Sequence, residues 1–172
     1  MRTRTPVFAL VLTLALIAPA AAIWVPQSRR EFVQAVAEGK GATKMETMTS
    51  ERSFDQVYAL LERKSSACLD REVRRSGFVG NQMEVSSSDY NPTLKRVGGN
   101  KAEFALQVVH RPRGLGATPP PGGLYVMAAD LKAVARDRTE VVLYIPAIGF
   151  KSISKTLRLW VAGEDADCPK LK

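Results

Sequence analysis

Histidine and cysteine are scarce in this chain of 172 residues, which has one of the first and two of the second. Zinc fingers, iron–sulfur clusters and multi-histidine metal sites need more of these side chains. The phosphate-binding motif GxxxxGK[ST] and the nucleophile-elbow motif GxSxG are also missing from the sequence. We therefore expect no metal site, no cofactor and a function other than catalysis.

A hydrophobic run long enough to cross a membrane is missing as well. Residues 1–22 begin with a segment that carries two arginines and no acid, continue with the apolar run of residues 7–17, and end in the tripeptide AAA. A membrane-spanning helix needs about 17–25 apolar residues, whereas this order is typical of a secretory signal peptide. We expect residues 1–22 to be removed and residues 23–172 to form one periplasmic or secreted domain without a membrane span.

The overall composition is that of a globular protein. Hydrophobic residues make up 45% of the chain and charged residues 24%, which excludes a wholly disordered chain and a polytopic membrane protein. The chain carries 25 Lys and Arg against 17 Asp and Glu. This basic excess indicates either a solubilising surface or an anionic partner. We expect no nucleic-acid partner, because the chain has an export signal and no recognised binding motif.

Cys68 and Cys168 are the two cysteines of the chain. An oxidising compartment favours a disulfide between them. The alternative is a catalytic thiol, which would leave one unpaired cysteine and would need a basic partner that the sequence does not identify. The sequence therefore predicts a disulfide.

Three helices are predicted from capping signals and apolar spacing. The sequences SRRE at residues 28–31 and SFDQ at residues 53–56 have the pattern of capping boxes. Apolar residues then recur three, four and seven positions apart up to Cys68, which places this cysteine on the buried face of the second helix. A third helix is predicted at residues 150–162, with Gly163 as its C-cap.

Strands are indicated by period-two alternation, which is clearest at residues 102–110. Further strands are predicted at residues 42–49, 94–97, 124–131 and 140–145. Residues 76–92 are rich in Gly, Ser, Asn and Asp and predict an irregular connection. The fold class expected is α+β, with an antiparallel sheet of about four to five strands packed by a helix from the N-terminal half and a C-terminal helix.

The loop at residues 112–123 contains three consecutive prolines between glycines. Proline removes backbone donors, so we expect this loop to stay outside the sheet and to project from the domain.

Three segments carry a resemblance to a known family. They are SFDQVYALLER within residues 48–69, GLYVMAADLKAVARDRTEVVLY at residues 123–144, and LRLWVAG with DCP within residues 157–169. Together they resemble an uncharacterised family of proteobacterial exported proteins and lipoproteins, which has no agreed activity to transfer. The order of elements is also similar to a reduced helix-grip, or START-like, architecture. That resemblance implies an apolar ligand held between the sheet and the C-terminal helix.

Two functions from different classes follow from these observations. The first is a non-enzymatic binding domain for a small apolar or amphipathic ligand, with the site lined by Phe104, Leu143, Leu157 and Trp160. The second is an envelope accessory protein that binds another protein or an anionic surface through basic loops, with the contacts made by Arg96, Lys101, Arg111 and Arg113. An apolar cavity above about 300 Å³ favours the first function and a filled core favours the second.

A hydrolase is a third and more distant interpretation. His110 is the one histidine, and Ser86, Ser87, Ser88 and Asp89 could complete a triad with it. Triads are recognised by geometry, so the sequence leaves this alternative open.

The mature protein should begin at Ile23, because the small-residue cleavage site ends at Ala22. Mass spectrometry of the N-terminus of the exported protein checks this expectation. An intact Met1 in the soluble fraction would contradict the export signal.

Overall fold

The structure is a computed structural model that describes residues 25–40, 43–112, 118–146 and 149–171. The predicted signal peptide, residues 1–22, lies outside the described residues. Across the described ranges, no helix is both long and apolar enough to span a membrane.

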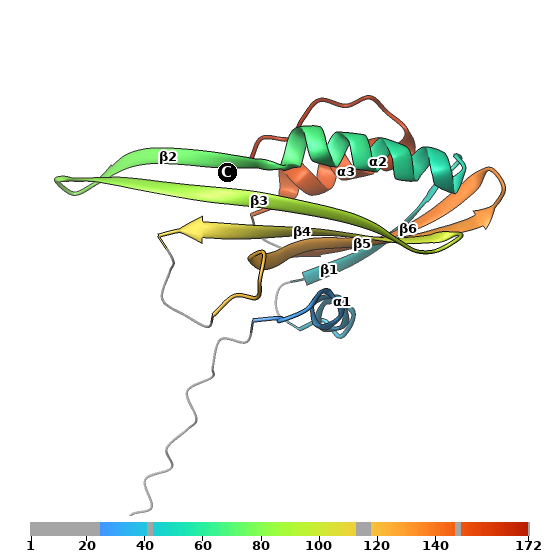
Figure 1. Ribbon diagram of the computed structural model, residues 1–172, viewed down its shortest axis with the longest axis horizontal. Coiled ribbons are helices and arrows are strands. Elements are labelled where there is room, and N and C mark those ends of the chain that lie inside the picture. Colours follow the sequence, from blue (N-terminus) through green and yellow to red (C-terminus); the bar gives the residue numbers. More distant parts are fainter. Residues whose placement is uncertain (1–24, 41–42, 113–117, 147–148, 172) are drawn as a thin grey trace, which may run out of the picture.

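The described chain forms one antiparallel sheet with helices on both faces (Figure 1). Six strands lie in the order β1-β6-β5-β4-β3-β2, so that the first and last strands of the sequence are neighbours. The elements are α1 (Arg29–Ala37), β1 (Thr43–Ser50), α2 (Phe54–Leu69), β2 (Arg71–Val79), β3 (Gln82–Gly98), β4 (Lys101–Arg111), β5 (Leu124–Ala135), β6 (Arg138–Pro146) and α3 (Lys151–Ala162).

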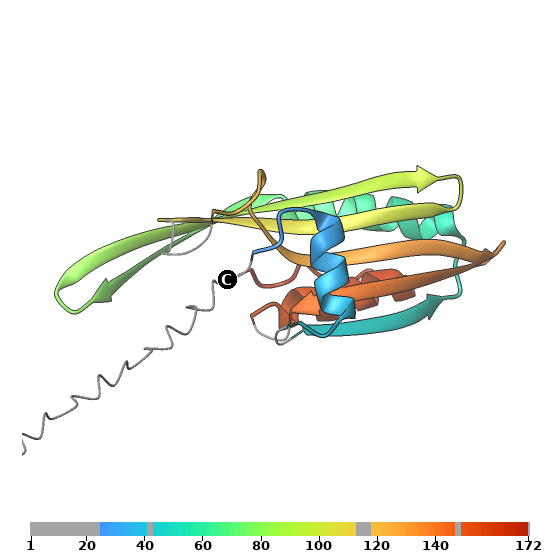
Figure 2. The ribbon, with the colours of Figure 1, turned by 90° about the horizontal axis from the view of Figure 1, so that it is seen from below.

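Helices α2 and α3 lie side by side over one face of the sheet, and α1 crosses the opposite face (Figures 1 and 2). The three helices begin close to the predicted positions. The Ser53 hydroxyl accepts a hydrogen bond from the Gln56 backbone, and the Gln56 side chain accepts one from the Ser53 backbone. The predicted capping box of α2 is thus confirmed. Helix α3 ends at Gly163, whose φ of +88° is the left-handed conformation that favours glycine.

The main core lies between the sheet and the pair α2 and α3. Trp160 of α3 is completely buried there, and its indole N–H donates to the Ala166 carbonyl at 3.0 Å. The same carbonyl accepts from the Lys64 ammonium of α2 at 3.1 Å. Cys68 and Cys168 form a disulfide, so the predicted cross-link is confirmed. Side chains of α2 and α3 therefore hold the C-terminal segment against the core.

The prediction of an irregular connection at residues 76–92 is wrong. These residues belong to a long hairpin in which β2 pairs with β3 from Arg71 opposite Tyr90 to Val79 opposite Gln82. The backbone ladder holds this hairpin, while its outer part is exposed on both faces. The composition of this segment did not indicate strands, because strands that pack against nothing on either face need no apolar residues. The sheet has six strands instead of four to five for this reason.

The second half of the loop at residues 112–123 does not project as expected, and residues 113–117 lie outside the described residues. The Gln107 amide donates to the carbonyls of Pro121 and Gly123, both at 2.9 Å. The Asn91 amide donates to the Gly122 carbonyl at 3.1 Å. A Cβ at Gly123 would lie 2.4 Å from the Val108 carbonyl oxygen, so this close approach requires glycine. Residues 118–123 are fixed to the sheet.

Replacing both cysteines by serine, Cys68→Ser with Cys168→Ser, should lower the free energy of unfolding by about 4–5 kcal/mol. The bond joins residues 100 positions apart, so breaking it frees the unfolded chain from a large loop constraint. Urea denaturation measures the change, with Ser66→Ala on the exposed face of α2 as a control that should stay near the wild type. An unchanged midpoint in the double variant would contradict this role.

Candidate functional site

The four residues expected to line a ligand site lie together, but in the packed core. Phe104, Leu143, Leu157 and Trp160 are each 0–1% exposed and belong to one buried cluster. Their side chains occupy the space between the sheet and α3, and none of them lines the groove beside α1 that is described below. The structure thus brings these residues together without opening a ligand site at this place.

The basic residues expected to contact a partner do not form one surface. Arg96 and Lys101 lie near the turn between β3 and β4, whereas Arg111 is at the other end of β4. The Arg96 guanidinium pairs with Asp55 at 2.7 Å and lies 4.4 Å from the centre of the Tyr58 ring. Arg111 pairs with Asp89 at 2.8 Å. Arg113 lies outside the described residues.

The triad considered for a hydrolase is not formed. The Ser88 hydroxyl lies 2.9 Å from Nδ1 of His110, because the two residues are direct partners across β3 and β4. Asp89 is the next residue along β3, so its side chain points to the opposite face, where it pairs with Arg111. A triad needs the acid on the imidazole nitrogen opposite the serine. Within the described ranges, moreover, no three histidine, cysteine or carboxylate side chains are placed to share a metal ion.

A groove beside α1 is the strongest candidate for a ligand site. It has a volume of about 600 Å³ and runs along α1 on the sheet face opposite α2 and α3. Five of its lining residues are apolar or aromatic, and two polar residues lie at the end where α1 leads into β1. The lining residues are Pro26, Phe32, Ala35, Val36, Tyr125, Lys40 and Thr43.

The apolar wall of the groove follows from the pattern of α1. Phe32, Ala35 and Val36 fall three and four residues apart, so they share one face of the helix, and all three are buried. Phe32 and Val36 pack with Ala128 and Tyr144 in a small cluster separate from the main core. The Phe32 ring also stacks on the Tyr125 ring of β5, with centres 6.2 Å apart.

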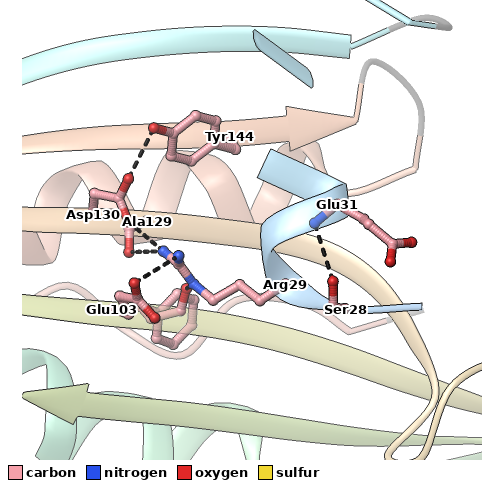
Figure 3. A network of polar contacts seen from close by, with 8 residues as sticks. Ser28, Arg29, Glu31, Glu103, Ala129, Asp130 and Tyr144 are labelled. Carbon is pink, nitrogen blue, oxygen red and sulfur yellow. Dashed lines mark hydrogen bonds and ion pairs between the residues drawn. The ribbon is translucent and has the colours of Figure 1, made fainter. Parts of the chain in front are cut away.

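Arg29, in the first turn of α1, anchors the helix to the sheet (Figure 3). Its guanidinium donates to the carbonyl of Ala129 at 2.8 Å and to that of Phe104 at 3.1 Å. It also forms ion pairs with Asp130 and with Glu103, which lies 3.5 Å away. Two carboxylates therefore compensate a guanidinium whose side chain is only 18% exposed. This anchor sets the position of α1 and, with it, the width of the groove.

Tyr144 completes this network from β6. Its hydroxyl donates to the second carboxylate oxygen of Asp130 at 2.9 Å (Figure 3). Burial, followed by the hydrogen bond to Asp130, raises the pKa of Tyr144 to about 12. The phenol therefore stays protonated and orients the carboxylate toward Arg29.

Sequence reasoning identified the α1 helix but assigned it no site. The apolar face of this helix was visible in the spacing of Phe32 and Val36. The contacts that form the groove join residues distant in sequence. Arg29, for example, binds Phe104 and Asp130, which follow it by 75 and 101 positions. An arginine directly after a helix cap, where acidic residues are preferred, was the one local signal.

Comparison with known proteins adds no family to this description. No protein-family model and no curated protein matches the sequence. Solved structures with partial similarity include the Zhui aromatase/cyclase from Streptomyces sp. R1128, at a TM-score of 0.29 and 14% identity over 59% of this chain. The chain spans 64% of the length of that enzyme.

Two further structures show a similar degree of likeness. Ara h 8.0201 has a TM-score of 0.32 and 8% identity, over 70% of this chain and 95% of that one. Hypothetical protein jhp0584 from Helicobacter pylori has a TM-score of 0.40 and 11% identity, over 87% and 96% of the two chains. We assign no function from likeness at this level, and the expected proteobacterial family stays a prediction.

The stability gained from Tyr144 should depend on pH. The folded state raises the pKa of this phenol from 10.0 to about 12, so it holds the proton more tightly than the unfolded state does. The contribution is complete below pH 10 and is lost as the pH rises through 12. The advantage of the wild type over Tyr144→Phe should therefore shrink by about 2 kcal/mol across this range.

Urea denaturation at several alkaline pH values measures this difference. Tyr58→Phe is the matched control, because Tyr58 lies on α2, away from the Arg29 network. A difference in the free energy of unfolding between wild type and Tyr144→Phe that stays constant with pH would contradict the prediction.

Proposed function

We propose that this protein is an exported, non-enzymatic binding domain that takes a small apolar or amphipathic ligand in the groove beside α1. The observation that carries the proposal is the groove itself. Its volume of about 600 Å³ falls within the range of about 300–1,000 Å³ found for small-molecule sites. Its walls are mostly apolar and aromatic, with few polar groups, which is the usual composition of such sites.

The polar residues at one end of the groove give the ligand an orientation. Lys40 and Thr43 follow the last turn of α1, and the Thr43 hydroxyl donates to the Lys40 carbonyl at 3.3 Å. The Lys40 side chain is 62% exposed, and its ammonium pairs with Glu38. An amphipathic ligand would lay its chain along the wall formed by Phe32 and Tyr125 and place its polar head near Lys40.

The location differs from the one inferred from the sequence, which was the space between the sheet and α3. That space is filled by Trp160 and its neighbours. The α1 groove is preformed instead, because the partly buried ion pairs of Arg29 fix the helix before any ligand arrives.

Export and the lack of catalysis complete the proposal. The Cys68–Cys168 disulfide supports an oxidising compartment such as the periplasm or the extracellular medium. The described residues that line the groove include no histidine, cysteine or carboxylate that could act as a base or nucleophile. The disulfide favours a location outside the cytoplasm, and the lining of the groove favours binding over catalysis.

Filling the groove should weaken ligand binding. Ala35→Phe adds a ring to the wall of the groove, and we expect about a tenfold loss of affinity for laurate, since burial of the alkyl chain supplies the free energy of binding. Isothermal titration calorimetry measures the affinity. Dodecanol, which has a similar chain and no charge, tests the contribution of Lys40 and should bind more weakly than laurate.

Ala37→Phe is the matched control, because the same substitution on the exposed face of α1 should leave binding unchanged. Thr43→Phe narrows the other end of the groove and serves if Ala35→Phe does not fold. A wild-type protein that binds neither laurate nor dodecanol, or equal losses in Ala35→Phe and Ala37→Phe, would contradict the proposal.

A further inference from the structure

The hairpin formed by β2 and β3 extends well beyond the helices and the rest of the sheet (Figures 1 and 2). Three large apolar side chains are exposed near its tip: Phe78 is 77% exposed, Met83 63% and Val85 58%. Single exposed apolar residues are ordinary on protein surfaces, but a cluster at a projecting tip indicates a contact surface.

The pairing of the two strands places these three side chains on one face. Phe78 lies directly opposite Met83, and Ser76 lies opposite Val85. Residues two apart on a strand point to the same side, so Phe78, Met83 and Val85 are neighbours. We call this cluster the apolar tip.

Arginines follow directly behind the apolar tip. Ser87 of β3 lies between Arg74 of β2 and Arg111 of β4 in the register of the sheet. Arg74 and Arg111 have side chains that are 75% and 62% exposed. Arg75 is next to Arg74 and, being adjacent on the strand, points to the reverse face. We call these three residues the arginine collar.

The acidic residues of this face lie still farther from the tip. Glu72 and Asp89 are opposite each other, two residues behind Arg74 and Ser87. Each pairs with one arginine of the collar, Glu72 with Arg74 at 2.9 Å and Asp89 with Arg111 at 2.8 Å. The order from the tip inward is therefore apolar, basic and acidic.

We propose that the hairpin tip docks the protein on an anionic phospholipid bilayer. The apolar tip enters the boundary between headgroups and acyl chains, and the arginine collar binds the lipid phosphates. Strands advance about 3.3 Å per residue, so Arg75 and Arg74 lie about 10 and 13 Å behind Phe78. Interfacial apolar groups penetrate about 5–10 Å, which places both guanidinium groups near the level of the phosphates.

A bilayer fits this surface better than a protein partner does. Stable protein interfaces cover about 800 Å² on each side, whereas the apolar tip is three side chains at the end of a two-stranded ribbon. A fluid bilayer can take up this small projecting tip, because its lipids rearrange around the inserted side chains and need no preformed complementary surface. Glu84 lies opposite Gly77 on the reverse face, away from the three side chains of the apolar tip.

Co-sedimentation with vesicles of equal parts phosphatidylglycerol and phosphatidylcholine tests the docking. The exported wild-type protein should bind these vesicles, and Phe78→Ser with Met83→Ser should lower the apparent affinity about tenfold or more, because both side chains lose apolar burial. The matched control is Met45→Ser with Val134→Ser, which removes two exposed apolar side chains outside the hairpin and should bind like the wild type.

The arginine collar predicts a dependence on lipid charge. Arg74→Gln with Arg75→Gln should weaken binding to the anionic vesicles by about fivefold for each arginine and should leave binding to pure phosphatidylcholine unchanged. In Phe78→Trp, brominated lipid should quench the fluorescence of the new tryptophan beyond the quenching seen in the wild type, as insertion of the tip requires.

Three results would overturn the proposal: no vesicle binding by the wild type, equal losses in the tip variant and its control, or binding without quenching in Phe78→Trp. Capture of an envelope protein that depends on Phe78, without vesicle binding, would identify the tip as a protein contact instead. The tip variants leave the α1 groove intact, so laurate affinity reports on the proposed function separately.

Discussion

The central strands β4 and β5 are buried on both faces, and the rest of the structure depends on covering them. Phe104, Leu106 and Val108 of β4 face α2 and α3, while Ala105 and Gln107 alternate with them and are also buried. A half-solvated antiparallel sheet needs helices on one face only. Here the second face has to be covered as well, and α1 covers it at β1, β5 and β6. The partly buried ion pairs of Arg29 fix that short helix in place.

The groove beside α1 and the tip of the β2–β3 hairpin both lie where the helices no longer cover the sheet. Helix α1 has 9 residues and cannot cover the whole outer face of the sheet, so a groove lined by Phe32 and Tyr125 is left along its flank. At the other edge, β3 has 17 residues and β4 only 11, so the outer part of β3 pairs with β2 alone. That part has no helix above or below it, and its side chains are free to meet something outside the protein.

The sequence predicted the elements whose signals are local and left out those held by distant contacts. The capping box at Ser53, the left-handed C-cap at Gly163 and the alternation in β4 all depend on neighbouring residues, and all are present. The β2–β3 hairpin is held by backbone hydrogen bonds and needs no buried apolar face, so its polar composition resembles that of a loop. Leu157 and Trp160 were correctly placed inside, but an apolar residue that packs and one that lines a cavity have the same sequence pattern. The groove depends on contacts of Arg29 with β4 and β5, which lie far along the chain, and no local sequence pattern predicts such contacts.

The two proposed surfaces share one side of the sheet. Tyr90 of β3 is buried in the main core, and the odd-numbered residues of this strand point to the opposite face. Met83 and Val85 are among them, so the apolar tip belongs to the face that α1 covers. Tyr125 of the groove is on this face as well, since its ring stacks on Phe32 of α1. The apolar tip and the groove therefore lie on the same face of the sheet. The opposite face is closed, because α2 and α3 pack there over the main core.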